Sequence, residues 1–241
     1  MNSGNPTLGS NTFRDVSLAQ GPPMTFAGTT SKTFFLLCLV ILGTVLTWRS
    51  GPVSQVLMVG GAIGGFILAM VTAFKKEWAP ITAPIYAFLQ GLFLGGISAI
   101  YNARTNGIVL QAVMLTFGVM AAMLFLYQSR VIRVTPGFVK GIAAATLGIA
   151  LFYIASLVLS FFGIPALTQI INSSSTLGIG LSIFIVCIAA LNLVLDFAMI
   201  EVGVANRGPK YMEWYCAFAL MVTLIWLYLE ILRLLAKVSR R

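Results

Sequence analysis

From residue 32 onward the chain alternates between long apolar stretches and short polar connections. Most of these stretches reach the roughly 20 residues that a helix needs to cross a bilayer. The connections hold Gly, Pro, Asn and charged residues, which end helices or stay in water. The pattern therefore predicts seven transmembrane helices, at about 33–48, 53–74, 81–101, 107–128, 138–162, 177–200 and 211–235.

Two segments lie outside this pattern. Residues 1–31 are rich in Gly, Ser, Thr, Asn and Pro and contain no apolar run, which predicts a flexible polar tail before a transmembrane domain at 32–241. Residues 163–176 carry Pro165 and several polar residues but no charge. Two interpretations of this segment are open: a connecting loop, or a partly inserted, re-entrant segment.

Glycines recur four residues apart in two of the predicted helices, at 60–61 with 64–65 and at 91 with 95–96. A spacing of four places them on one helix face, where small residues let backbones approach closely in lipid. Close packing is the favoured interpretation. The alternative is a helix that slides during gating.

Composition indicates an all-α integral membrane protein, with the lipid bilayer as its surroundings. Of the 241 residues 59% are apolar and 9% charged, whereas ordinary soluble domains are roughly a quarter charged. The chain has no histidine, which removes the commonest general base and metal ligand. Its three cysteines have no metal-binding spacing. We therefore expect no cofactor and no enzymatic activity.

The net charge of +9 comes from basic residues spread singly and in pairs between the apolar stretches. Nucleic-acid binding would require a basic patch, so it is not expected. Dispersed basic residues instead indicate orientation, because they are enriched in cytoplasmic loops. Nine lie in the tail and in alternate loops, and two lie in the loops of the other side; in chain order the nine are Arg14, Lys32, Lys75, Lys76, Arg130, Arg133, Lys140, Arg207 and Lys210.

This distribution predicts a cytoplasmic amino terminus, and short loops of this kind are compatible with a bacterial cytoplasmic (inner) membrane. Seven spans then place the carboxyl terminus on the opposite side, although four basic residues occur there: Arg233, Lys237, Arg240 and Arg241. An additional half-span at 163–176, or one crossing fewer, would remove this conflict.

Acidic residues are the strongest candidates for function. Only six occur, and four of them lie in the last two spans: Asp196, Glu201, Glu213 and Glu230. An ionised carboxylate at the centre of a bilayer costs roughly 2.5–3.5 kcal/mol. Asp196 is the leading candidate because apolar residues surround it. Asn192 lies one turn earlier on the same helix face.

The turn between the last two spans suggests a partner for Asp196. Counted from the middle of this turn, Asp196 and Glu213 differ in depth by about 4–5 Å. Two carboxylates this close cannot both ionise cheaply, so one would keep a proton and lose it as the pH rises. Such a pair could act as a proton-sensitive latch or as a cation site, with Asp196 as a calcium ligand.

A second interpretation places Glu201 and Glu213 at the membrane interface, paired with Arg207 and Lys210. For Glu201 this interpretation is favoured. For Asp196, a functional role is favoured.

Glu230 lies three residues before Arg233, the spacing of an ordinary helix ion pair. Thr223 is seven residues before Glu230 and therefore shares its helix face. This stripe makes Thr223 a candidate site residue and Glu230 a secondary one.

Several motifs occur in order over residues 32–237, namely Lys32-Thr33, APIYAFLQGLFLG at 83–95, LNLVLDF at 191–197, MEWY at 212–215 and TLIWLYLEILR at 223–233. Together they resemble the transmembrane Bax inhibitor motif family, most closely its bacterial, YccA-like members. The resemblance implies seven helices with the last one central. It also implies a proton-sensitive calcium leak, governed by aspartates on spans six and seven and latched by an arginine from span two.

Carried over by position, Asp196 matches the span-six aspartate, whereas Thr223 stands near the span-seven position. Span two contains no arginine. Gln90 stands where this branch is expected to have a glutamate, and Ala198 where a second aspartate is common. Either Asp196 with Glu213 replaces the family's sensor, or proton sensing has been lost.

Two functional hypotheses follow. The leading one is a passive cation leak, calcium being the expected ion, under pH control through Asp196. The other is a regulator that conducts nothing and binds a membrane protease or stress machinery, with residues 1–31 as the part that the protease engages. An intramembrane enzyme is disfavoured because a second deep acid is missing. The sequence leaves the oligomeric state open.

Overall fold

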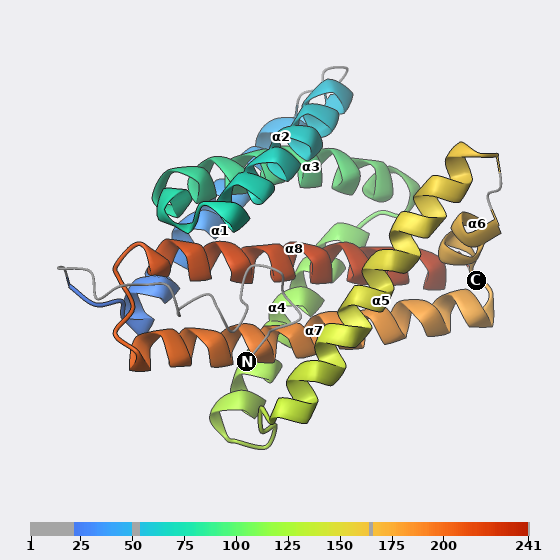
Figure 1. Cartoon of the computed structure of the whole chain (residues 1–241). Helices are drawn as coiled ribbons and strands as arrows, with labels where there is room; N and C mark the ends of the chain where they lie inside the picture. Colours follow the sequence, from blue (N-terminus) through green and yellow to red (C-terminus); the bar gives the residue numbers. More distant parts are fainter. Residues whose placement is uncertain (1–21, 50–53, 164–165, 241) are drawn as a thin grey trace. The chain divides into compact units, whose positions relative to one another are not determined.

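The structure is a computed structural model and describes residues 22–49, 54–163 and 166–240. This part of the chain is almost entirely helical and contains no β-strand, only an isolated bridge between Pro23 and Pro209. Figure 1 labels the helices, which are α1 Phe26–Arg49, α2 Ser54–Phe74, α3 Ala79–Arg104, α4 Ile108–Gln128, α5 Pro136–Phe161, α6 Ala166–Asn172, α7 Thr176–Ala205 and α8 Met212–Val238, with a 3-10 turn, η2, at Lys76–Trp78.

Seven of these helices are long and apolar enough to cross a membrane, which confirms the predicted number of spans. The exception is α6, whose seven residues extend over only about 10 Å. It lies in the segment 163–176, and the hydroxyl groups of Ser156 and Thr168 attach it to α5 at 3.0 Å. Residues 164–165 are outside the described part. The segment therefore contains a short helix and not a further span.

Helix α1 begins at Phe26, earlier than the predicted tail boundary at residue 31, so that boundary is wrong. The threonines that suggested a tail are compatible with a helix here. Thr30 and Thr33 each donate a hydrogen bond to the carbonyl group four residues earlier. Thr25 accepts a hydrogen bond from the Gly28 amide, the geometry of a helix N-cap. Residues 1–21 of the predicted tail lie outside the described part.

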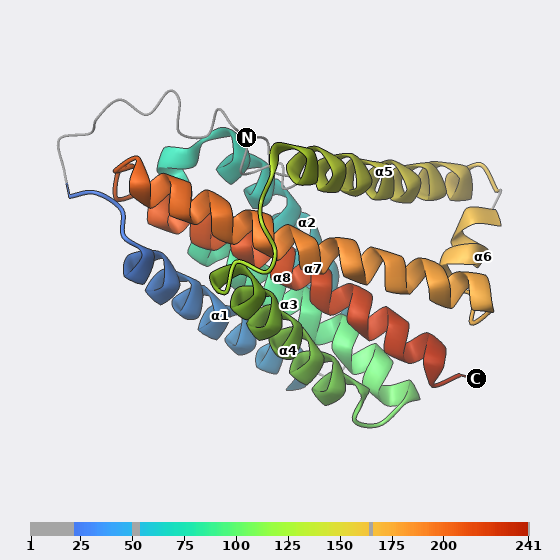
Figure 2. The same ribbon diagram turned by 90° about the horizontal axis from the view of Figure 1, so that it is seen from below.

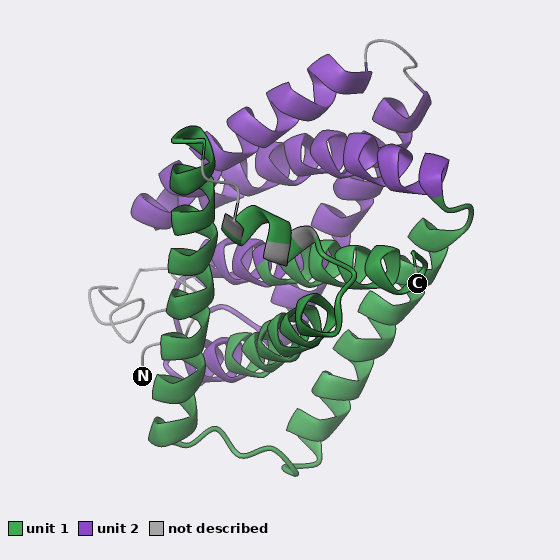
Figure 3. Ribbon diagram, turned by 90° about the vertical axis from the view of Figure 1, so that its right-hand side faces the viewer, with its two compact units in different colours: residues 1–5, 105–197, 223–241 green, residues 6–104, 198–222 purple. Residues whose placement is uncertain are grey.

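The chain forms two compact units, which Figure 3 shows in different colours. Unit 1 contains α4, α5, α6, the part of α7 that ends at Phe197 and the part of α8 that begins at Thr223. Unit 2 contains α1, α2, η2, α3, the end of α7 from Ala198 and the start of α8 up to Val222. Helices α7 and α8 thus contribute to both units. The predicted single domain at 32–241 and the central position of the last helix stay predictions.

Glycines let three helices of unit 2 pack closely, since α1 and α2 both lie against α3. A Cβ atom added to Gly43 would lie 2.5 Å from the Phe88 carbonyl oxygen, and one on Gly61 would lie 2.5 Å from the Leu89 carbonyl oxygen. On α3, Gly95 faces α1 in the same way. Only a residue without a side chain fits such contacts. The predicted close packing is confirmed for Gly61, Gly91 and Gly95 but is wrong for Gly60, whose added Cβ would meet no atom within 4 Å. The sliding of a helix during gating stays a prediction.

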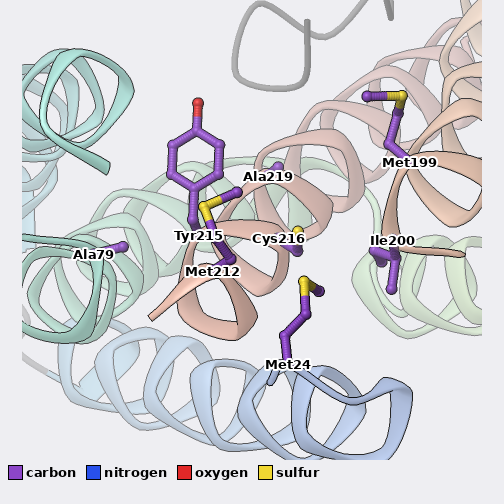
Figure 4. Packing of buried hydrophobic residues seen from close by; sticks show 8 residues of the cluster. All are labelled: Met24, Ala79, Met199, Ile200, Met212, Tyr215, Cys216 and Ala219. Carbon is purple, nitrogen blue, oxygen red and sulfur yellow. The ribbon is translucent and has the colours of Figure 1, made fainter. Parts of the chain in front are cut away.

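A second part of unit 2 is an apolar cluster, shown in Figure 4, that joins four segments. Met24 precedes α1, and its backbone N–H donates to the Gly208 carbonyl oxygen at 2.7 Å. The cluster places the chain before α1 against the turn between α7 and α8. Its other members are Ala79 of α3, Met199 and Ile200 of α7, and Met212, Tyr215, Cys216 and Ala219 of α8.

Unit 1 has an apolar cluster of its own, formed mainly by β-branched residues. Val139, Ile142 and Ile149 of α5 pack with Ile185, Ile188 and Leu195 of α7. Helix α5 is capped by Thr135, whose side chain accepts a hydrogen bond from the Phe138 amide, and proline occupies its first position. Figure 2 labels both helices. These contacts fix which face of α7 points toward α5.

Helices α2, α4 and α5 expose large apolar side chains, which are unfavourable in contact with water. Phe66 of α2 is 65% exposed, Phe125 of α4 68% and Leu147 of α5 61%. In α7 and α8, by contrast, most of the apolar length is buried. Contiguous apolar surface of this extent marks contact with lipid. The protein is an integral membrane protein.

The structure shows that two basic residues near the carboxyl terminus have bonding partners. Lys237 is buried in unit 1 and donates to the Gly178 carbonyl oxygen at 2.8 Å and to the Ser182 hydroxyl group at 2.6 Å. Arg233 is paired with Glu230. Two of the four terminal cations are therefore bonded to other groups of the protein, and the orientation of the chain stays a prediction.

The packing of α3 generates the first prediction. Gly95→Ala should lower the melting temperature of the detergent-purified protein by several degrees, because its methyl group would lie 2.5 Å from the Thr44 carbonyl oxygen and overpacking costs about 1–3 kcal/mol. Gly60→Ala is the matched control, since no atom lies within 4 Å of its added Cβ. Equal melting temperatures for the two variants would contradict this account of the helix contact.

Candidate functional site

Asp196 lies in α7 at the end of its unit 1 part and is completely buried. Its neighbours Leu195 and Phe197 are also buried, and the ring of Phe197 lies 6.1 Å from that of Tyr127 of α4. A carboxyl group in such surroundings is far costlier to ionise than one in water. The structure therefore places the Asp196 carboxyl group inside the protein, away from water.

Asn192 lies one turn before Asp196 and is 2% exposed. Its side-chain nitrogen donates to the Thr146 hydroxyl group of α5 at 2.8 Å and to the Ile188 carbonyl oxygen at 2.9 Å. Its side-chain oxygen accepts no hydrogen bond from the described residues. This buried oxygen is an available ligand for a cation next to Asp196.

Thr223 of α8 lies at the same level as Asp196 in unit 1. Lys237 of α8 donates a hydrogen bond to Ser182 of α7, and levels along the two antiparallel helices are counted from this contact at about 1.5 Å per residue. Thr223 lies fourteen residues before Lys237 in α8, and Asp196 lies fourteen residues after Ser182 in α7. Thr223 is 3% exposed. Its hydroxyl group, and not a second carboxylate, therefore stands at the level of Asp196.

Glu230 is paired as the sequence predicts, and it has an additional partner. Its carboxylate accepts two hydrogen bonds from Arg233, at 2.9 and 3.0 Å. The hydroxyl group of Tyr153, from α5, donates to the same carboxylate at 2.8 Å and accepts a hydrogen bond from Arg233. Glu230 is 2% exposed. The pair thus joins α8 to α5 inside unit 1.

Glu213, at the start of α8 in unit 2, is held by cations. One carboxylate oxygen accepts from the Thr25 amide at 2.8 Å, from the Thr25 hydroxyl group at 3.0 Å and from Lys210 at 2.8 Å. The other forms an ion pair with Lys32 of α1. The contact with Lys210 confirms the predicted ion pair, whereas the position of Glu213 at the membrane interface stays a prediction. Two ammonium groups and the amino end of α8 all stabilise its ionised form.

The surroundings of Glu213 are closely packed. The ammonium group of Lys32 lies 5.5 Å from the centre of the Trp214 ring, a cation–π contact. A Cβ atom on Gly28 would collide with the Glu213 carboxylate. Burial, and to a lesser extent the charge of Glu77, raises the pKa of Tyr211 in the adjoining turn, so this phenol stays neutral. The cluster fastens the start of α1 to the start of α8.

The other two secondary candidates, Glu201 and Gln90, have less to support them than Glu230. Glu201 is exposed near the end of α7, which agrees with the favoured interface interpretation. Gln90 of α3 is half-buried, and its amide nitrogen would lie 2.9 Å from a Cβ atom on Gly65. Gln90 therefore packs against the backbone of α2.

The sequence did not identify three residues that complete these clusters: Lys32, Tyr153 and Lys237. Each bonds to a residue far away in the chain, so no local pattern marks it. The predicted pair of Asp196 with Glu213 stays a prediction, since the two residues belong to different units. Among the described residues no three Cys, Asp or Glu side chains assemble into a metal site. A cation at Asp196 would rely on one carboxylate and on neutral oxygen atoms.

Comparison with known proteins identifies the family. The model of the family described as Bax inhibitor 1 like matches residues 5–240, nearly the whole chain. The chain belongs to this family. None of the curated proteins matches the sequence. The family assignment agrees with the seven spans and confirms the resemblance seen in the sequence, whereas the bacterial branch stays a prediction.

Membership in the Bax inhibitor 1-like family directs attention to α7 and α8, where the resemblance implies the functional acids. Asp196 occupies the position expected on span six. Thr223 occupies the expected level on span seven and is a hydroxyl residue. Glu213 is bonded to Lys32 and Lys210 in unit 2, and its role as the partner of Asp196 stays a prediction.

The Glu213 cluster generates the second prediction. Lys32→Met should lower the free energy of unfolding by about 1.5–3 kcal/mol, the contribution of a hydrogen bond to a charged group, because the Lys32 side chain is only 18% exposed. Lys210→Met should cost less than about 1 kcal/mol, because the Lys210 side chain is 50% exposed. Denaturant titration in detergent measures both variants. A larger loss for Lys210→Met would contradict the described arrangement.

Proposed function

We propose that the protein is a passive leak for cations, calcium being the transported ion, and that the protonation of Asp196 controls it. One observation carries the proposal: a completely buried carboxyl group lies in a membrane-spanning helix. Apolar residues would cost less in that position, so an acid retained there is a candidate for function. Membership in the Bax inhibitor 1-like family supports the same conclusion.

The oxygen atoms near Asp196 support a transient site better than a permanent one. Calcium takes six to eight oxygen ligands when it is bound tightly. Here one carboxylate is accompanied by the side-chain oxygen of Asn192, one turn away, with the Thr223 hydroxyl group at the same level. A weak site of this kind lets an ion leave as readily as it enters, which conduction requires.

The proposal assigns proton sensing to Asp196 alone. A protonated carboxyl group is neutral and attracts a cation weakly, whereas an ionised one attracts it strongly. Glu213 is less suited to this role because two ammonium groups hold it. The same reasoning speaks against an aspartyl protease, which needs two acids, since Thr223 stands at the level of Asp196.

For the orientation we propose a cytoplasmic amino terminus in a bacterial inner membrane. The support is the excess of basic residues in the tail and in alternate loops. The bonding of Arg233 and Lys237 inside unit 1 makes the basic carboxyl terminus a weaker argument against it.

The third prediction tests the leak. In liposomes with a calcium-sensitive dye inside, the native protein should give a calcium flux that rises with pH, because an ionised carboxyl group at Asp196 attracts a cation more strongly than a protonated one does. Asp196→Asn should reduce the flux to the level of protein-free liposomes at every pH. Glu77→Gln is the matched control, since it removes an exposed acid from η2 and should leave the flux unchanged.

Two outcomes would overturn the proposal. A native protein that conducts no calcium at any pH would favour the regulator that conducts nothing. A flux with the same pH dependence in the native protein and in Asp196→Asn would show that another group senses protons. Monodisperse elution and an unchanged melting temperature establish that each variant is folded.

A further inference from the structure

The connection between α4 and α5, together with the start of α5, carries a group of basic residues. Arg130, Arg133 and Lys140 lie within eleven residues of the sequence, and all three are exposed. Figure 1 shows the connection in yellow-green between the two helices. The sequence has no acidic residue from Ala79 to Leu195. We name the three residues the basic group.

Unit 1 offers the basic group no acidic partner. Its sequence contains only two acids, Asp196 and Glu230. Asp196 is completely buried, and Glu230 is 2% exposed and paired with Arg233. The other ion pairs among the described residues use Lys32 and Lys210. The three exposed charges are therefore not balanced by an acid of unit 1.

The amino end of α5 adds positive potential at the same place. This helix begins at Pro136, its cap is Thr135, and its first turn contains no acid. The amino end of a helix carries a partial positive charge, which acids stabilise and cations oppose. Lys140 is the fifth residue of α5, and its side chain leans toward that end because Cα–Cβ bonds tilt toward the helix amino terminus. Like charges thus gather here, an arrangement that an external anion would stabilise.

The backbone that carries the two arginines is bonded to the end of α4. Arg130 has a φ of 57°, in the left-handed region, and its N–H donates to the Tyr127 carbonyl oxygen at 3.1 Å. The N–H of Ile132 donates to the Leu126 carbonyl oxygen at 3.3 Å. The chain between the arginines therefore folds back onto α4, which limits the positions from which their side chains extend.

Exposed apolar side chains place the basic group next to lipid. Phe125 of α4 is 68% exposed, and Val131, directly after Arg130, is 69% exposed. Cations beside such residues can keep their charges among the lipid headgroups while their stems contact apolar surface. The anions at this depth are headgroup phosphates, and the planar guanidinium group of arginine matches a phosphate with two hydrogen bonds.

We propose that Arg130, Arg133 and Lys140 form a binding site for the headgroup phosphate of an anionic phospholipid, at the amino end of α5. The exposed Val131 and Phe125 favour a lipid over a soluble anion or an acidic protein segment, because acyl chains cover apolar side chains as well. The site attaches unit 1 to one leaflet of the membrane. It does not depend on whether the protein conducts cations.

Lipid binding to the full-length protein in detergent tests the site. The probe is fluorescent phosphatidylglycerol. The triple variant Arg130→Gln, Arg133→Gln, Lys140→Gln should bind it at least about tenfold more weakly than the native protein, since each cation near an anionic lipid surface contributes about fivefold. Fluorescent phosphatidylcholine, which has no net charge, should bind equally to both proteins.

A second triple variant is the matched control. Arg49→Gln, Arg104→Gln, Arg240→Gln removes the same number of charges from exposed positions outside the basic group, and it should keep the native affinity for phosphatidylglycerol. If both triple variants lose the same affinity, the attraction follows net charge and the site is overturned. Unchanged binding in the first variant would overturn it as well.

Competition identifies the source of the anion. Inorganic phosphate or polyglutamate, at the same concentration as the lipid, should leave phosphatidylglycerol bound to the native protein, because neither covers Val131 and Phe125. Complete displacement by either would overturn the commitment to a lipid. Equal melting temperatures of the native protein and both variants in phosphatidylcholine–detergent micelles establish that a change in binding does not come from unfolding.

Discussion

A charge inside a membrane protein must be matched by other groups of the protein, because neither lipid nor water is there to solvate it. Two buried acids obey this constraint in full. Glu213 is bonded to Lys32, Lys210 and Thr25, and Glu230 is bonded to Arg233 and Tyr153. Each cluster joins α8 to another helix of its unit. The polar contacts therefore determine which helix lies against each half of α8.

The apolar contacts follow a different rule, since lipid is as apolar as the side chains and burial alone gives little driving force between helices. In unit 2 the helices gain contact by close approach, and the glycines of α1, α2 and α3 allow it. In unit 1 the helices α5 and α7 pack through branched side chains. Close approach at glycines and the bonds of Glu213 hold the helices of unit 2 together, whereas branched apolar side chains and the bonds of Glu230 hold those of unit 1.

The surroundings of Asp196 determine what its carboxyl group can do. It is buried at the end of the unit 1 part of α7, one turn from Asn192 and level with Thr223. Apolar residues dominate its helix, so its protonation state changes the charge of a region that contains few others. Such a group can shift the equilibrium between two conformations only if the free-energy difference between its ionised and neutral forms differs between these conformations. A bundle interior meets this condition better than a membrane surface does.

The sequence by itself determined several features that depend on local composition. Apolar length predicted the seven spans, isolation in an apolar run singled out Asp196, and a spacing of three predicted the pair of Glu230 with Arg233. Each is local because hydropathy and helix-face neighbours extend over a few residues. The start of α1 was missed for the same reason, since threonines that bond to their own helix look like tail residues in a local window.

Only the tertiary structure decided which distant groups meet. Lys32 and Glu213 are separated by 181 residues, and Tyr153 and Glu230 by 77. Whether two such side chains touch depends on the rotation and register of two helices, which packing sets and composition does not. Counted from the bond of Lys237 to Ser182, Thr223 lies at the level of Asp196. The sequence thus shows which residues are the buried acids, whereas the fold decides which side chains contact them.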